Sequence, residues 1–353
     1  MAGTSPAMTW RVSFITKVGI SFRNEPDYRE SNMRVYCRKG IQIIAGLLLA
    51  SVTAIAADAA YKVRVGKSVT QPFAFAPIEI GLEKGIWARH GLELEVSIFA
   101  GDAKLQQALV ANSVDFGLGS GPAIGFLAKG VPAKAIGVIA NEPLSMGLIV
   151  GPSSAIRTPG DLKGAKIGIS TEGSLTYWLA RELSRRMGWG SDGIRTVALG
   201  AISAQLAALK RNQIDGFVMS SSQGYLLEKH KDGRLLLEFG DYIKDFHTHV
   251  ILATDDMIRK QPDQVRGFLS GWIDAIAFMA ANKEETVRIA REVTGLDEDI
   301  ERREYDEVMP MMSRDLRFSP KALDVIGDSF PELQILPKKP DMTTLFTEEF
   351  LPK

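Results

Sequence analysis

The sequence predicts an α/β protein made of two similar halves, each with a mostly parallel sheet covered by helices on both faces. Three observations support this prediction. Strand-like and helix-like patterns of apolar residues alternate from Tyr61 onward, an order typical of parallel sheets. The length of 353 residues suits two domains better than one. A segment of the first half, 108–120, recurs in the second half as 208–220.

The recurring segment matches in register at five residue types, namely Ala108, Leu109, Asn112, Asp115 and Ser120 against Ala208, Leu209, Asn212, Asp215 and Ser220. Each copy predicts a helix end, a tight turn, a short apolar strand and a polar loop that opens the next helix. Such loops lie where open α/β sheets bind ligands. We therefore expect one ligand held between two halves; chance likeness between short α/β units is the alternative.

The first half carries the signals of alternating strands and helices. Strands are predicted at 62–69, 92–99, 114–118 and 133–140. Helices are predicted at 75–90, 103–111 and 121–129. Gly91 suits the position after a helix end, and Asp102 suits an N-cap.

The second half repeats the alternation after an expected crossing at 148–152 and a turn-rich stretch. Strands are predicted at 165–169, 194–198, 214–219, 235–239 and 249–253. Helices are predicted at 173–187, 201–211 and 222–231. From Asp255 the pattern becomes helical, with Pro262 in a first turn, and it continues to about Phe330.

The N-terminal region predicts export. A basic stretch from Arg34 precedes a short apolar core at 41–50, and small residues at 54–59 fit a cleavage pattern. A membrane span needs about 20 apolar residues, so an uncleaved anchor is only the alternative. We expect a signal peptide at 33–59 and a mature protein that is free in the periplasm.

Residues 1–32 do not fit this layout, because they place acidic residues ahead of the basic stretch. Met33 directly precedes Arg34, so we expect translation to start there and the upstream extension to be non-native or disordered. The single cysteine, Cys37, precedes the apolar core. The mature chain is therefore expected to lack disulfides, thiol nucleophiles and cysteine metal sites.

The overall charge excludes no small ligand. Lys and Arg total 42, as do Asp and Glu, so the formal net charge is zero. A neutral chain gives no argument for nucleic acid or an anionic membrane surface as a partner. A small anion can still bind, because local donors decide its affinity.

Signals for catalysis and metal binding are weak. The sequence has neither the full Gly-x-x-x-x-Gly-Lys-Ser/Thr phosphate-loop motif nor a Gly-x-Ser-x-Gly nucleophile elbow. His247 and His249 alternate in a predicted strand, which should put both imidazoles on one side. No acidic or cysteine ligands accompany them at metal-binding spacing. We expect a structural or hinge role for this pair, and no metal, cofactor or catalytic residue.

Four loops that follow strands carry the candidate ligand-binding residues. Their glycines allow close approach, their hydroxyls can donate, and the helix N-termini that follow favour an anionic oxygen. Glu172 would oppose an anion if it pointed inward. Ordinary N-capping is the alternative for any one loop. The candidates are Gln71, Phe73 and Phe75; Ser120, Gly121 and Pro122; Thr171, Gly173 and Ser174; and Ser220, Ser221 and Ser222.

Two motifs carry a family resemblance. The run APIEIGLEKGIWARHGL at 76–92 resembles the opening of the nitrate/sulfonate/taurine (SsuA/THI5-like) solute-binding proteins of ABC importers. The run TPGDLKGAKIG at 158–168 is similar to their entry into the second lobe, and the turns at 112–117 and 212–216 are similar as well. The likeness covers about Tyr61 to Phe278.

The resemblance implies the type II periplasmic-binding-protein fold, in which two α/β lobes joined by two crossing segments close around a ligand. Lobe one would hold 61–147 and 251–353, and lobe two 148–250. The ligand would be a small organic or oxyanion-bearing solute. A monomer without catalytic turnover would deliver it to a membrane permease and its ATPase.

Two departures from the family pattern argue against a sulfonate. Gly121 stands where sulfonate binders tend to carry an acidic residue, and 220–222 replaces a Trp-Asp-Pro-like run. Phe73 and Phe75 leave room for an apolar or ring portion of a ligand. The alternatives are a thiamine-pyrimidine-precursor enzyme of the related branch, against which the cysteine-free mature chain counts, and a ligand-sensing protein with the same fold.

Overall fold

The computed structural model describes residues 60–69 and 73–353. The expected upstream extension at 1–32, the signal peptide at 33–59 and the candidate Gln71 lie outside these residues. None of the helices in the described ranges is both long and apolar enough to span a membrane.

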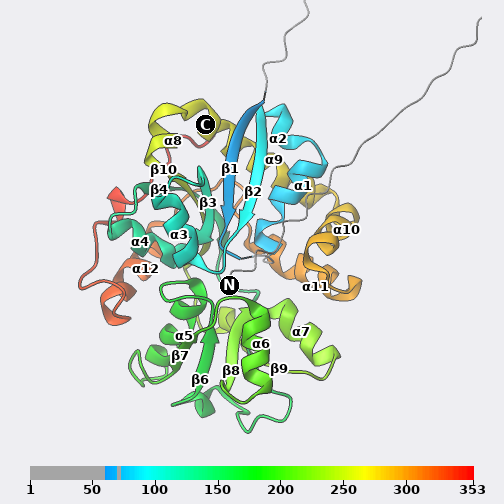
Figure 1. Ribbon diagram of the computed structural model, residues 1–353, viewed down its shortest axis with the longest axis vertical. Helices are drawn as coiled ribbons and strands as arrows, with labels where there is room; N and C mark the ends of the chain where they lie inside the picture. The colour runs from blue at the N-terminus through cyan, green and yellow to red at the C-terminus, as the bar shows by residue number, and fades with distance from the viewer. Residues whose placement is uncertain (1–59, 70–72) are drawn as a thin grey trace, which may run out of the picture. The chain divides into compact units, whose positions relative to one another are not determined.

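Two five-stranded sheets form the framework (Figure 1). The first has the order β2 (Leu92–Ile98), β1 (Tyr61–Lys67), β3 (Phe116–Ser120), β10 (His247–Thr254) and β4 (Ala133–Asn141). The second has the order β7 (Arg195–Ala198), β6 (Lys166–Ile169), β8 (Gly216–Ser220), β5 (Met146–Val150) and β9 (Arg234–Glu238). The two orders correspond strand for strand, which confirms the predicted α/β fold with two similar halves.

One strand in each sheet runs against its neighbours. β10 is antiparallel to β3 and β4, and β5 is antiparallel to β8 and β9, whereas the β1 and β6 pairings are parallel. Both exceptions are the first strand after the chain changes sheets, at 142–145 and again at 239–246. The crossing expected at 148–152 is therefore wrong, because 146–150 is a paired strand inside the second sheet.

Helices cover both faces of the first sheet. Along β10, Val250 and Leu252 belong to one apolar cluster and Ile251 and Ala253 to another, which places the clusters on opposite faces. The α-helices are α1 (Pro77–Glu83), α2 (Ile86–Arg89), α3 (Asp102–Val110), α4 (Ile124–Ala128), α5 (Leu175–Arg186), α6 (Ile202–Lys210), α7 (Ser221–Lys229), α8 (Asp255–Lys260), α9 (Pro262–Ala281), α10 (Lys283–Thr294), α11 (Glu298–Val308) and α12 (Pro320–Glu332). Short 3-10 helices are η1 (Phe73–Phe75), η2 (Gly121–Ala123), η3 (Pro159–Leu162), η4 (Phe239–Asp241), η5 (Met309–Met311) and η6 (Met342–Thr344).

The single helix expected at 75–90 is broken into η1, α1 and α2. Gly85 lies between α1 and α2 with φ of 63°, a left-handed conformation that glycine adopts without steric cost. The break turns Trp87 into the core, where its ring stacks on Phe268 at 5.1 Å and its Nε1–H donates to the Ile78 carbonyl at 3.0 Å. Phe268 stacks in turn on Phe116 of β3 at 4.2 Å, which joins α2 and α9 to the sheet.

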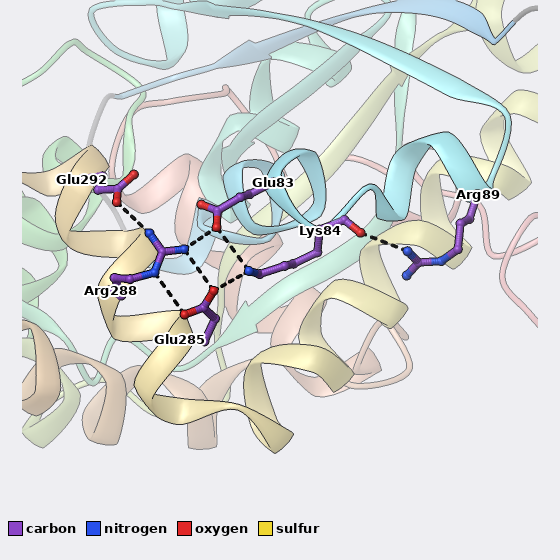
Figure 2. Close-up of polar contacts among 6 residues, drawn as sticks. All are labelled: Glu83, Lys84, Arg89, Glu285, Arg288 and Glu292. Carbon is purple, nitrogen blue, oxygen red and sulfur yellow. Dashed lines mark hydrogen bonds and ion pairs between the residues drawn. The ribbon is translucent and has the colours of Figure 1, made fainter.

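An exposed ion-pair network connects α1 to α10 (Figure 2). The Glu285 carboxylate accepts bonds from Lys84 and from Arg288, and Arg288 also contacts Glu83 and Glu292. The neighbouring cations lower the pKa of Glu285 to about 2. Since solvent and salt screen exposed pairs, we assign this network an orienting role rather than a large share of stability.

The recurring sequence segment is one local structure used twice. Asn112 and Asn212 both adopt left-handed backbone, with φ of 50° and 54°, which asparagine tolerates better than most residues. Asp115 accepts the Arg64 backbone N–H at 2.7 Å, and Asp215 accepts the Lys166 backbone N–H at 2.7 Å. Asp115 therefore joins β3 to β1, and Asp215 joins β8 to β6, the equivalent pair of the second sheet.

Replacing these aspartates should destabilise the two halves unequally. Asp115 is half-buried and also accepts two bonds from the Arg64 guanidinium, at 2.6 and 3.1 Å, whereas Asp215 is exposed. We expect Asp115→Ala to lower the free energy of unfolding by about 1.5–3 kcal/mol and Asp215→Ala by less. Urea titrations measure both, with the exposed Asp241→Ala as the control. Equal losses in Asp115→Ala and the control would contradict this account.

Candidate functional site

A cavity of about 260 Å³ is lined by residues of both sheets. It lies at the carboxyl ends of β3 and β8 and includes the end of β6 and the start of α3 and α5. Residues of the first half that line it include Ser68, Ile98, Phe99, Asp102, Ser120 and His249. Residues of the second half include Met146, Ser170, Leu175, Thr176, Ile202, Gln205, Met219 and Ser220. The volume suits a compact ligand, because pockets for drug-sized molecules are about 300 Å³ or larger.

Ser120 and Ser220, the two matched ends of the recurring segment, line this same cavity. They are the last residues of β3 and β8, which occupy the same place in the two sheet orders. The topology therefore brings together two positions far apart in the sequence. Their role toward a ligand stays a prediction.

The aromatic candidates Phe73 and Phe75 lie in the core rather than on the cavity wall. Both are buried at 1% and 0% exposure. Phe73 packs edge-on against Tyr305 at 6.0 Å, and Phe75 packs edge-on against His249 at 5.0 Å. Because Phe75 supports His249, which does line the cavity, it shapes the wall from behind.

Gly121 and Pro122 also stand behind the cavity. A Cβ on Gly121 would lie 1.9 Å from the His247 carbonyl oxygen, so glycine is required there for close approach of the protein's own backbone. Pro122 lies in the first turn of η2, where its missing N–H costs nothing. The expectation that Gly121 admits a ligand is not supported by this geometry.

The loop at 170–174 contributes Ser170, whereas the three candidates from this loop have internal partners. Thr171 Oγ1 accepts the Ala103 backbone N–H at 3.3 Å. Gly173 has φ of 76° and packs beside Phe126. Ser174 is the N-cap of α5, where its Oγ accepts the Tyr177 N–H at 3.3 Å, as the capping alternative predicts.

Ser221 and Ser222 begin α7 and lie outside the cavity lining. The Ser221 N–H donates to the Ser145 carbonyl at 2.7 Å, which ties α7 to the segment that crosses between the sheets. The hydroxyls of Ser222 and Ser220 are bonded to each other at 3.0 Å. Glu172 is exposed and does not line the cavity.

Asp102 is the main residue that sequence reasoning missed. We expected it to be an N-cap, but Gly101 holds that position and Asp102 lies in the first turn, 3% exposed. Its Oδ1 accepts the Ser120 N–H at 2.9 Å and its Oδ2 the Ser120 hydroxyl at 3.0 Å, and the Leu175 N–H of α5 also donates to the carboxylate. Burial raises the pKa of Asp102, and these three bonds lower it in part. An Asp beside a glycine at a helix start is the signal, but capping explains it equally well.

The side chains of His247 and His249 lie in different surroundings. A β-bulge at 247–249 replaces regular alternation in the pairing with β4, so the expectation that both imidazoles share one side is wrong. His247 packs edge-on against Phe318, and its Nδ1 bonds Asn141 at 2.8 Å while its Nε2 accepts the Ser319 N–H at 3.0 Å. His249 lines the cavity, and its buried Nδ1 has no partner among the described residues.

Across 60–69 and 73–353, no group of three His, Cys, Asp or Glu residues could hold a metal ion. Burial lowers the pKa of His247 to about 4 and that of His249 to about 3, so both are neutral at physiological pH. The cavity therefore offers hydrogen-bonding groups and apolar surface to a ligand.

The lowered pKa of His247 predicts that the stability of the fold depends on pH. A proton binds His247 more tightly in the unfolded chain, where the His pKa is about 6.5, than in the folded protein. The free energy of unfolding is therefore unaffected by this group above pH 6.5 and decreases as the pH falls towards 4. We expect wild type to lose up to about 3 kcal/mol more than His247→Gln between pH 7 and pH 4. Denaturant melts at several pH values measure the difference. The exposed His230→Gln variant should follow wild type; parallel curves for all three proteins would refute the assignment.

Comparisons with known proteins bear on this site. A family model described as "NMT1/THI5 like" matches residues 73–286. A Brucella abortus protein described as a binding protein is 26% identical over 220 residues, covering 62% of this chain and 67% of that protein. A Legionella pneumophila 4-amino-5-hydroxymethyl-2-methylpyrimidine phosphate synthase is 23% identical over 290 residues, covering 80% and 90%.

The fold is shared with a solved structure. The alkanesulfonate-binding protein SsuA from Xanthomonas axonopodis pv. citri, bound to MOPS, superposes with a TM-score of 0.71 at 19% identity, covering 81% of this chain and 98% of that one. At this identity the likeness establishes the architecture, namely the periplasmic-binding-protein fold, and leaves the ligand open.

Proposed function

The chain belongs to the NMT1/THI5-like family, and on that premise we propose that it is the solute-binding component of an ABC importer. It captures a small molecule between two lobes and delivers it to a membrane permease with its ATPase. The observation that carries the proposal is that Ser120 and Ser220, at the ends of equivalent strands of the two sheets, line the same cavity.

The proposed lobes are 61–147 with 251–353, and 148–250, adjusted by the few residues through which β5 and β10 overrun these bounds. The two crossing segments, 142–145 and 239–246, would form the hinge. On the cavity side the lobes meet where Thr171 accepts the Ala103 N–H at 3.3 Å. A Cβ on Gly200 would also lie 3.8 Å from that of Ala100. These contacts support a closed arrangement that must open to admit a ligand.

We also propose that the protein is exported through a signal peptide at 33–59 and works as a periplasmic monomer. Support comes from the basic, apolar and small-residue order of that segment. Export would remove Cys37, the single cysteine of the sequence, from the mature protein.

Binding without turnover is favoured over the synthase reaction of the Legionella relative. The hydroxyl of Ser220 pairs with Ser222 rather than with the cavity imidazole of His249. A nucleophile activated by a base requires the two groups to be within hydrogen-bond reach. Among the described residues no serine hydroxyl of the cavity is bonded to an imidazole; the hydroxyl of Ser120 donates to the Asp102 carboxylate at 3.0 Å, and that carboxylate also accepts two backbone N–H groups.

A bound solute should raise the melting temperature, because it binds the folded state alone. A ligand present at 100 times its Kd adds about 2.7 kcal/mol to the free energy of unfolding. Thermal-shift measurements against sulfonates, nitrate, taurine, pyrimidines, aromatic carboxylates and small amines test the proposal. Absence of any shift across this panel at millimolar concentration would refute it.

Filling the cavity should abolish the shift. Ile202→Trp at the half-buried cavity wall and Ser220→Trp at the strand end both place an indole in a space of about 260 Å³. We expect at least a hundredfold loss of affinity in each variant, by isothermal titration calorimetry. The exposed Ser153→Trp is the control and should bind like wild type. An unchanged affinity in both cavity variants would place the binding site elsewhere.

A further inference from the structure

A carboxylate of the protein itself, that of Asp102, occupies the position in the cavity where a bound oxyanion would be expected. The carboxylate of Asp102 accepts the backbone N–H of Ser120 at 2.9 Å, the hydroxyl of Ser120 at 3.0 Å and the N–H of Leu175 at the start of α5. Backbone N–H groups and a helix N-terminus together form an anion-binding site. Asp102 comes from the first half and Leu175 from the second, so this carboxylate also bridges the two lobes.

Four of the five serine and threonine hydroxyls that line the cavity, those of Ser120, Ser170, Thr176 and Ser220, already have a side-chain hydrogen-bond partner. Ser170, Ser174 and Thr176 bond one another in a triangle with sides of 3.0–3.1 Å. Ser120 Oγ donates to Asp102 and accepts the Ala123 N–H at 3.3 Å. Each hydroxyl has one proton to donate, so an oxyanion would have to break these bonds to be solvated.

The remaining polar groups in the described lining of the cavity include free acceptors and no cation. Gln205 is 2% exposed, its amide N–H donates to the Gly200 carbonyl at 3.0 Å, and its Oε1 is buried without a described partner. His249 is neutral and therefore supplies one acceptor nitrogen and one N–H donor. No lysine or arginine is among the described lining residues. The buried Lys67 at the end of β1 is neutralised by Glu79, at 2.6 Å.

The rest of the wall is apolar and sets the size of the ligand. Val69, Ile98, Met146, Leu175 and Met219 contribute to it. The cavity of about 260 Å³ suits a compact solute such as a single substituted ring, since pockets for drug-sized ligands are about 300 Å³ or larger.

We infer that the ligand is a compact, ring-sized solute that presents N–H donors, as an ammonium or amino-nitrogen group, to Asp102 and Gln205, and that sulfonates and other oxyanions are rejected. This inference rests on the proposed function and specifies its ligand class. Buried Asp102 has three neutral partners and no cation, so a donor-bearing ligand completes its charge balance. A sulfonate would lie beside a carboxylate with no cation to compensate either charge.

Ligands of similar shape and different charge test this inference. Binding of single-ring amines and amino-substituted rings is compared with binding of the matching alcohols and sulfonates, for example benzylamine, benzyl alcohol and benzenesulfonate, by thermal shift and calorimetry. We expect the tightest binders to carry N–H donors. Asp102→Asn should lower the affinity for these ligands at least tenfold and reduce the ratio of amine affinity to sulfonate affinity. The exposed Asp263→Asn, in the first turn of α9 and outside both the cavity and the crossing segments, is the control and should bind like wild type.

A second variant tests the inference independently if Asp102→Asn fails to fold. Gln205→Met keeps the size of the side chain and removes its acceptor, and it should weaken the same ligands severalfold. The lost bond to the Gly200 carbonyl should lower the unliganded melting temperature without unfolding the protein, which circular dichroism checks. A sulfonate or carboxylate that binds wild type more tightly than its amine counterpart, and is blocked by Ile202→Trp, overturns the inference and leaves the proposed function standing. No binding in any charge class overturns the proposed function, and the inference with it.

Discussion

The site depends on one constraint, namely that the chain passes between its two sheets twice and by short connections. The passages at 142–145 and 239–246 insert β5 and β10 antiparallel beside the third strand of each sheet. The parallel strands of both sheets then present their carboxyl ends to one cavity. Loops at these ends are the general location of ligand sites in open α/β sheets. The cavity is thus a consequence of topology before any particular side chain is considered.

Local structure near the cavity is stabilised by the same groups that face it. Ser120 belongs to β3, bonds Asp102 of α3 and accepts the Ala123 N–H that follows it. Gly121 permits β10 to approach within contact distance, and Phe75 holds His249 against the wall. Substitutions intended to alter binding here will therefore also alter packing, so matched exposed controls are needed to separate the two effects.

The arrangement separates the architecture shared with relatives from the chemistry of this chain. The fold superposes on that of an alkanesulfonate-binding protein, yet the described lining here contains a buried carboxylate and no lysine or arginine. Architecture constrains where a ligand lies, whereas the few polar side chains at that place decide its charge. Asp102 is the residue of this chain that sets the electrostatic sign of the cavity.

The sequence by itself determined the α/β class, the duplicated topology and the positions of Ser120 and Ser220, because strand and helix periods and the Asn–Asp turns are local signals. It did not determine where the chain crosses between sheets, since a buried strand such as β5 and a linker can have similar apolar composition. Only the tertiary structure turned Gly121 and Phe75 away from the cavity and brought Asp102 into it. The direction of a side chain there depends on contacts between residues far apart in the chain, such as Ser120 and Leu175 around Asp102.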